Sequence, residues 1–162
     1  MVLPLAEYPE SGWDKVMAIN TKTPFFLTKA LVGLLGKRAT AEATSSVINI
    51  SSIAGSLPAG DENYAYGASK AAVDHVTTSL ALRLARKHIR VNAIAPGRFY
   101  SKMTRYVSED PEALQKEFDA IPLQRWGGDT DIAGIAILLS SKAGAFITGD
   151  VITADGGFKL IA

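Results

Sequence analysis

The sequence predicts an α/β fold in which helices cover a parallel β-sheet. Three short runs rich in apolar and β-branched residues, at 47–51, 89–95 and 148–154, predict strands, and segments of helical periodicity separate them. Strands that are apolar along their whole length and alternate with helices are typical of parallel sheets, which are joined by right-handed crossovers. At 162 residues the chain is long enough for one domain with a sizeable core, so a single unit over 1–162 is expected.

The N-terminal third of the chain contains a helix and then a strand. Ser11 and Asp14 have the spacing of a helix start, and the apolar pattern continues to about Leu35. Residues 37–46, rich in alanine and threonine, predict a loop before the first strand. Residues 52–62 contain two glycines and a proline, which predict a loop after that strand.

The middle of the chain continues the alternation. A helical pattern extends over residues 63–87, and the second predicted strand follows it at once. Pro96-Gly97 ends that strand, because proline lacks the N–H that a sheet ladder needs.

The C-terminal third begins with a long excursion over residues 98–128, which contains a predicted helix near 111–120. Asp129 or Thr130 is expected to cap a last helix that reaches Ser140, because short polar side chains accept hydrogen bonds from the first helical N–H groups. The third strand completes the pattern.

Composition excludes several classes of function. A net charge of +1 gives no electrostatic reason to expect nucleic acid or an anionic membrane as a partner. The absence of cysteine excludes disulfides and thiolate sites, and with only His75 and His88 as imidazoles no metal site is expected. The N-terminus has neither the basic region nor the apolar run of a signal peptide, and no segment reaches membrane-spanning length, so a cytoplasmic location is expected.

Polar or turn-forming residues follow all three predicted strands. They are Ser51-Ser52, Pro96-Gly97 and Asp155-Gly156-Gly157. Each could be turn chemistry by itself. Because ligands of open parallel sheets bind outside the carboxyl ends of the strands, their joint placement predicts a cleft at that end of the sheet.

Two tyrosines, Tyr64 and Tyr66, open the helix predicted at 63–87. Residues four apart share one helical face, so Tyr66 lies beside Lys70, whereas Tyr64 lies beside Ala68. A neighbouring ammonium favours phenolate over phenol, which allows a tyrosine to donate and accept a proton near neutral pH. Tyr66 is therefore the candidate for proton transfer. The alternative is an exposed tyrosine–lysine pair that contributes only to helix stability.

The Tyr66–Lys70 pair belongs to a set of sequence stretches that occur together. The set contains Trp13-Asp-Lys-Val-Met-Ala-Ile-Asn20, Val47-Ile-Asn-Ile-Ser-Ser52-Ile-Ala-Gly55, Tyr66-Gly-Ala-Ser-Lys70, Val91-Asn-Ala-Ile-Ala-Pro-Gly97, and Ile147-Thr-Gly-Asp150 through Asp155-Gly-Gly157. With these stretches the chain resembles the short-chain dehydrogenases/reductases, and the resemblance covers nearly its whole length in order. Residues 96–104 and 121–127 further resemble the 3-oxoacyl-thioester reductase-like branch of that family.

The resemblance implies an NAD(P)-dependent oxidoreductase that reduces a carbonyl or oxidises an alcohol by hydride transfer. It implies that Tyr66 gives or takes the proton at the substrate oxygen. It further implies that Lys70 assists Tyr66 and bonds the nicotinamide ribose, that Ser52 holds the carbonyl oxygen, and that Asn20 is the catalytic asparagine. A strand-end turn serine is the alternative for Ser52.

The resemblance also implies a set of cofactor contacts after the second strand. The segment that follows it bonds the nicotinamide amide and the phosphates in the family, and Ser101 stands where a threonine is usual. Tyr66 and Lys70 share in the cofactor contacts, and the remaining candidates are Pro96, Gly97, Phe99 and Ser101.

Asn20 has a local feature of its own, because Pro24 follows four residues later. Proline has no N–H, so the carbonyl of Asn20 is expected to lack its helical partner and the helix to kink there. A free carbonyl facing inward could hold a water near Lys70, as the family's proton relay requires. The alternative is a simple kinked helix in which Asn20 is hydrogen-bonded locally.

Residues 1–162 contain neither the glycine-rich turn with which the family binds pyrophosphate nor its Asn-Asn-Ala-Gly strand end. The expected fold is therefore an incomplete, Rossmann-like C-terminal portion that lacks the first βαβ units. The adenine half of the site falls outside this sequence. The expected cofactor is NADP or NAD, with NADP favoured.

Three alternatives remain open at this point. The sequence could be the C-terminal part of a reductase whose front half was lost by truncation, processing or gene-model error, and it would then be inactive alone. It could be a short chain that acts as an oligomerisation partner without catalysis, or an enzyme that is active as given. The expected partners are a small carbonyl or alcohol substrate, an acyl thioester among the candidates, and further copies of the same chain as a homo-oligomer.

Overall fold

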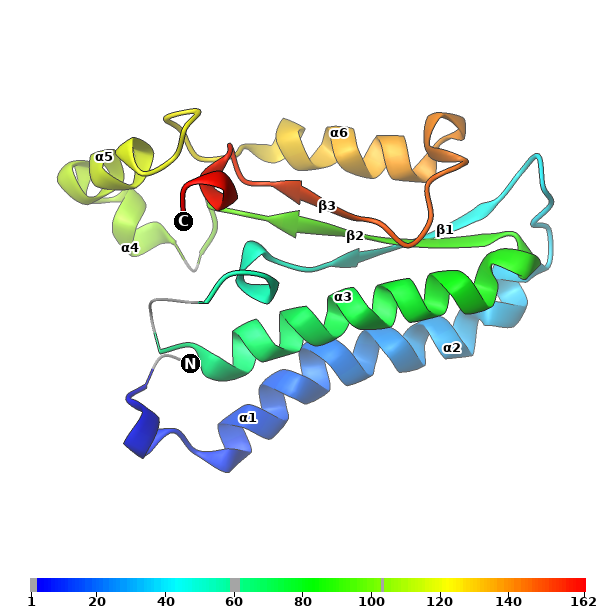
Figure 1. Cartoon of the computed structure of the whole chain (residues 1–162), viewed down its shortest axis with the longest axis horizontal. Helices are drawn as coiled ribbons and strands as arrows, with labels where there is room; N and C mark the ends of the chain where they lie inside the picture. Colours follow the sequence, from blue (N-terminus) through cyan, green and yellow to red (C-terminus); the bar gives the residue numbers. More distant parts are fainter. Residues whose placement is uncertain (1–2, 59–61, 103) are drawn as a thin grey trace.

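One parallel sheet of three strands organises the molecule, in the order β1-β2-β3 (Figure 1). The computed structural model describes residues 3–58, 62–102 and 104–162. The strands are β1 (Ser45–Ile50), β2 (Ile89–Pro96) and β3 (Val151–Ala154). Together with the flanking helices, this sheet confirms the predicted α/β class.

Helices cover both faces of the sheet. The α-helices are α1 (Glu10–Met17), α2 (Thr23–Gly36), α3 (Tyr64–Leu84), α4 (Arg105–Ser108), α5 (Pro111–Asp119) and α6 (Asp129–Ser140). Helices α2 and α3 pack on one face, with α1 against α3, and α6 packs on the other (Figure 1). The strands point towards the end of the molecule where α4, α5 and the C-terminus lie (Figure 1).

The core lies between β2 and the long helix α3. β2 is the central strand and is buried over nearly its whole length, and its buried residues include the polar Arg90 and Asn92. The cluster that joins the strand to the helices contains Ala81, Leu84, Ile89 and Val91, with Val32, Leu35, Val47 and Leu80 packed around it.

The buried side chain of Arg90 holds α6 against the sheet, at the end of the sheet opposite the carboxyl ends of the strands. Arg90 is 5% exposed, and its guanidinium donates to the carbonyls of Leu139 and Gly144 at 2.7 and 2.9 Å and to Thr44 Oγ1 at 2.7 Å. These acceptors include the carbonyl end of α6, where a positive charge is stabilised by the helix dipole. Arg90 thus ties β2 to α6 and to the turn that follows α6.

The first predicted helix is divided into three parts. It begins at Glu10, with Pro9 rather than Ser11 at the N-cap and no side-chain cap bond, so the predicted cap is wrong. A π-helical segment, Ala18–Lys22, separates α1 from α2, and the N–H of Thr23 bonds the carbonyl of Ala18 five residues earlier. The wider turn lies directly before Pro24, where the regular hydrogen-bond pattern would fail because proline has no N–H.

The starts of β3 and α6 also differ from the prediction, because side chains bind backbone N–H groups there. β3 begins at Val151, not at Thr148, because Thr148 Oγ1 accepts from Val91 N at 3.2 Å and Asn92 Oδ1 accepts from Asp150 N at 3.0 Å. Neither Asp129 nor Thr130 caps α6. Gly128 is the N-cap, and its N–H donates to the Asp131 carboxylate at 2.8 Å.

Short helical turns lie in the connections between these elements. The loop predicted at 52–62 contains a 3-10 turn at Ile53–Gly55, and its residues 59–61 lie outside the described part. Helix α4 was not predicted, because four residues are too few to show a helical period. Within the described residues, no helix has the length and apolar character needed to cross a membrane.

Candidate functional site

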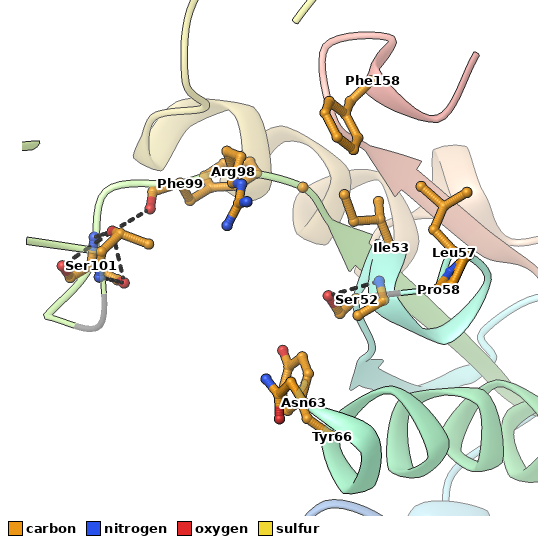
Figure 2. Close-up of a pocket in the computed structure, with 13 residues that line it drawn as sticks. Ser52, Ile53, Leu57, Pro58, Asn63, Tyr66, Arg98, Phe99, Ser101 and Phe158 are labelled. Atoms are coloured by element: carbon orange, nitrogen blue, oxygen red, sulfur yellow. Dashed lines mark hydrogen bonds between the residues drawn. The ribbon is translucent and has the colours of Figure 1, made fainter. Parts of the chain in front are cut away.

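A cavity of about 350 Å³ lies beyond the carboxyl ends of β1 and β2 (Figure 2). It brings together five of the candidates, Ser52, Tyr66, Gly97, Phe99 and Ser101. The other three, Asn20, Lys70 and Pro96, do not line it. The full lining is Ser52, Ile53, Ala54, Leu57, Pro58, Asn63, Tyr66, Gly97, Arg98, Phe99, Ser101, Thr104 and Phe158.

The two tyrosines at the start of α3 have different surroundings. Tyr66 lines the cavity, and Lys70 Nζ lies 5.4 Å from the centre of its ring. Tyr64 is 40% exposed and packs edge-on against Tyr8, with 5.6 Å between ring centres. The structure therefore places the ammonium beside Tyr66, as the spacing of four residues indicates.

Lys70 is a buried cation that spans from α3 to the end of β1. Its side chain is largely buried, and Nζ donates to the carbonyl of Ile50 at 2.8 Å. Burial lowers the pKa of Lys70, and the carboxylate of Asp74, one helical turn further on, acts in the opposite direction. Burial in turn raises the pKa of Asp74, against the opposing effects of Ser51, Lys159 and Lys70.

Ser52 lies in the turn that leaves β1. Its Oγ accepts the N–H of Ala54 at 3.2 Å and so caps the 3-10 turn Ile53–Gly55. The same oxygen faces the cavity (Figure 2). The turn-serine role is therefore observed, and it leaves the hydroxyl proton free to be donated to a ligand.

Two glycines let the Ser52 turn pack directly on the helix that carries Tyr66. A Cβ at Gly55 would lie 2.9 Å from backbone atoms of Lys70 and Ala71, and a Cβ at Gly67 would lie 3.1 Å from the carbonyl oxygen of Ala54. Any side chain at Gly55 would push the turn away from the helix. This contact fixes how far Ser52 stands from Tyr66.

Asn20 supports α3 from the π-helical segment. Its Nδ2 donates to Ser69 Oγ at 3.0 Å, and Ser69 Oγ donates to the carbonyl of Tyr66 at 2.7 Å. Thr21 Oγ1 adds a bond to the carbonyl of Ser69 at 3.1 Å. The Asn20 side chain is thus hydrogen-bonded to the helical turn that presents Tyr66 and Lys70, and the predicted water on its carbonyl stays a prediction.

Residues after β2 form the opposite wall of the cavity. The Ser101 and Thr104 hydroxyls lie 3.1 Å apart, and Thr104 Oγ1 also donates to the carbonyl of Phe99 at 2.9 Å (Figure 2). Gly97 is also required by the packing of the strand ends. A Cβ there would lie 2.7 Å from the Cβ of Asp155, so the glycine lets the strand ends of β2 and β3 meet.

A family model described as Enoyl-(Acyl carrier protein) reductase matches residues 2–159 of this chain. The chain belongs to the short-chain dehydrogenase/reductase family. The fold and the order of the motifs agree with that membership, and the sequence resemblance is confirmed.

Among its relatives in this family, the chain is 48% identical over 156 residues to a rhamnolipids biosynthesis 3-oxoacyl-[acyl-carrier-protein] reductase of Pseudomonas aeruginosa, covering 96% of this chain and 61% of the relative. It is 36% identical over 154 residues to a 5-keto-D-gluconate 5-reductase of Escherichia coli, covering 95% of this chain and 59% of the relative. The chain thus spans about three fifths of the length of these curated relatives.

Solved structures show the same relation. The Pseudomonas aeruginosa RhlG/NADP active-site complex superposes with a TM-score of 0.93 at 47% identity, over 98% of this chain and 62% of that one. A gluconate 5-dehydrogenase from Burkholderia cenocepacia in complex with NADP and tartrate gives 0.89 at 28% identity, over 100% and 62% of the two chains. Because the chain covers only 62% of each of these two structures, its Rossmann-like fold is incomplete relative to theirs. Both of these structures are NADP complexes.

Several site residues of this short-chain dehydrogenase/reductase were not found from sequence. Ser69 lies within the Tyr66–Lys70 motif, three residues after Tyr66, a spacing that could have indicated it. Phe158 reaches the cavity because Asp155 accepts the N–H groups of Gly157 and Lys159 at 2.9 and 2.8 Å and folds the C-terminal turn back. No local pattern in the sequence signals that return.

Proposed function

We propose that the chain is the catalytic C-terminal part of an NAD(P)-dependent oxidoreductase that reduces a carbonyl or oxidises an alcohol by hydride transfer. The observation that carries this proposal is the shared cavity of Ser52 and Tyr66, with the buried Lys70 ammonium beside Tyr66. Family membership supports the reaction type. Because the chain spans only about three fifths of its relatives, catalysis belongs to the proposal.

The side chains of the site have hydrogen-bonding capacity left for a ligand. Ser52 Oγ accepts from Ala54, so its proton can be donated to the substrate oxygen. Lys70 has three donors and uses one of them on Ile50, which leaves the others for a ribose hydroxyl. In this proposal Tyr66 exchanges a proton with the substrate oxygen, and Asn20 keeps the turn of Tyr66 and Lys70 in place through Ser69.

The described residues fit the nicotinamide end of the cofactor. The cavity wall offers the Ser101 hydroxyl and the backbone of Gly97 and Phe99, next to Pro96 at the end of β2. We propose that these residues hold the ring and its amide, and that Tyr66 and Lys70 hold the ribose. When bound, the nicotinamide supplies or takes the hydride. NADP is preferred over NAD in this proposal, supported by the NADP named in the two structural neighbours.

The substrate is proposed to be a small carbonyl or alcohol compound. Two candidates follow from relatives: an acyl thioester, from the name of the Pseudomonas aeruginosa reductase, and a sugar acid, from that of the Escherichia coli reductase. Apolar side chains on the cavity wall, such as Ile53, Leu57 and Phe158, would accommodate an aliphatic part of either ligand.

The test compares the two tyrosines in a protein in which residues 1–162 follow a nucleotide-binding front half. Tyr66→Phe should lower NADPH-dependent carbonyl reduction by roughly 100-fold or more, the range of general acid–base catalysis, while NADPH still binds. Tyr64→Phe is the matched control, because Tyr64 packs on Tyr8 outside the cavity. Equal losses at both positions in steady-state assays would contradict the assignment.

A second candidate function is a non-catalytic oligomerisation partner. It is favoured by the apolar side chains that α2 leaves exposed, Phe25, Phe26, Leu27, Leu31 and Leu34. A homo-oligomer is proposed under both functions. The intact mass of the natural protein separates them, because a natural protein of 162 residues without a front half would favour the non-catalytic role.

A further inference from the structure

Arg98 brings a formal charge into a cavity wall that is otherwise uncharged. Among the described residues that line the cavity with Ser52 and Tyr66, it alone is an Asp, Glu, Lys or Arg. Its side chain points from the loop after β2 into the space bordered by Ser52, Asn63 and Tyr66 (Figure 2). A cation in this position faces whatever compound has its carbonyl at Tyr66.

The guanidinium of Arg98 is only partly engaged by the protein. Its Nε lies 3.0 Å from Glu117 Oε2 of α5, and the two side chains are 45% and 28% exposed. Within the described part of the chain, its two terminal nitrogens have no hydrogen bond. Arg125 is the contrast, because both of its terminal nitrogens bind the Asp131 carboxylate, at 2.8 and 3.0 Å.

The terminal nitrogens of a guanidinium match the two oxygens of a carboxylate or a phosphate, so Arg98 keeps an unused recognition surface. Glu117 shows that a carboxylate can approach this arginine. A partly exposed ion pair of this kind contributes little free energy, so a ligand carboxylate can add to it or replace it at little cost.

We propose that Arg98 determines substrate specificity by binding a carboxylate of the carbonyl compound, so that the substrates are small oxo acids or the matching hydroxy acids. This inference rests on the proposed function. It favours the sugar-acid type of substrate over the acyl thioester, which has no carboxylate near its reacting carbonyl. The cofactor's phosphates are another source of the same anionic chemistry, and the test separates the two.

The first test measures binding, so it does not depend on turnover. The probes are 2-oxopentanoate, 4-oxopentanoate and 5-oxohexanoate, each compared with its methyl ester, in amide chemical-shift titrations of the 162-residue chain. At least one acid should bind roughly 10- to 100-fold more tightly than its ester, as expected for a charge-assisted pair. Arg98→Met should bring this ratio to about one, and Arg98→Lys should retain part of it.

Two further variants sharpen the binding test. Glu117→Gln should raise the affinity for the acids roughly two- to five-fold, because a competing carboxylate is removed. Arg105→Met is the matched control, since Arg105 lies outside the cavity and pairs with Glu109 at 3.8 Å, and it should leave the acid-to-ester ratio unchanged. Equal affinities for acids and esters, or a ratio unaffected by Arg98→Met, would overturn the inference.

The second test uses the protein completed with its nucleotide-binding half. If Arg98→Met weakens NADPH binding but leaves the acid-to-ester ratio intact, the anion belongs to the cofactor and the inference fails. If esters and thioesters are reduced as well as the acids, the inference fails while the proposed oxidoreductase stands. If no carbonyl compound is reduced, the proposed function fails, and the binding ratio alone then decides whether Arg98 recognises a carboxylate.

Discussion

Asp74 is the acidic neighbour of Lys70 on the same face of α3, and the two groups act on each other. Burial lowers the pKa of Lys70, whereas the negative charge of Asp74 raises it. Lys159, from the C-terminal turn, also faces Asp74 and lowers the pKa of that carboxyl group. Burial favours loss of the Lys70 proton, and Asp74 opposes this effect. The proposed role of Tyr66 depends on the positive charge that Lys70 then keeps.

We expect Asp74→Asn to move the alkaline limb of the pH–rate profile towards lower pH in the completed enzyme. The direction of this shift follows from the loss of the Asp74 carboxylate, whose negative charge raises the pKa of Lys70. The pKa of Lys70 then falls further below 10.5, so the ammonium loses its proton at a lower pH. The measurement is kcat/KM against pH, with Asp129→Asn as the control at an exposed position on α6. An unchanged limb, or a shift to higher pH, would show that Lys70 does not set it.

For single residues, the sequence predicts which side chains are neighbours on one helix, but not which contacts join different elements. The Tyr66–Lys70 neighbourhood follows from a spacing of four residues alone. The hydrogen bond from Lys70 to Ile50 joins residues that are 20 positions apart, and the bond from Asn20 to Ser69 joins residues that are 49 apart. Such contacts depend on how the elements pack, which no local pattern encodes.

β1 is an edge strand of the sheet. Within the described residues it pairs with β2 alone, and its sequence, Ser45 to Ile50, contains no lysine or proline that would discourage further pairing. Ile50 is 54% exposed at its end. This exposed edge is an observation, whereas its effect on association is a prediction.

The 162-residue chain should self-associate at micromolar concentration, because an unprotected edge can pair with another copy. Sedimentation velocity over a concentration series measures this. Ile50→Glu should weaken the association by placing a charge at the edge. Leu82→Glu, at a position 84% exposed on α3, is the matched control for an apolar-to-acidic change elsewhere. A monodisperse monomer would refute the prediction, and equal effects of the two variants would place the contact away from β1.

The sequence predicted which segments are helices and which are strands, because the spacing of apolar residues reflects which side chains are buried. The residues at which these elements begin and end were predicted less well. The helices over 63–87 and 129–140 and the three strands lie where the pattern placed them, within a few residues. The caps failed because Pro9 and Gly128 precede helices without using side chains of their own. The π-helical segment before Pro24 was predicted only as a kink, because a helix can absorb a missing N–H in more than one way.

At the scale of the whole molecule, the proposed ligand site is a cavity at the strand ends without the family's phosphate-binding turn. The residues that follow β1, β2 and β3 supply the cavity around Tyr66, as the polar and turn-forming residues after the three predicted strands indicate. The phosphate-binding turn of the family does not occur in residues 1–162. This division was predictable from motif order alone, and the coverage of about three fifths of the relatives agrees with it.

We expect the 162-residue chain to show no saturable binding of NADH or NADPH below millimolar concentration, and no measurable reductase activity. The proposed contacts of the described residues reach the nicotinamide and its ribose only. A cofactor held without its pyrophosphate cradle loses several charge-assisted hydrogen bonds of about 1.5–3 kcal/mol each, which weakens affinity by several orders of magnitude. A titration of cofactor fluorescence, with and without a nucleotide-binding front half supplied covalently or as a separate chain, measures this. The front half should restore both binding and activity, whereas micromolar affinity of the 162-residue chain alone would show that it is self-sufficient.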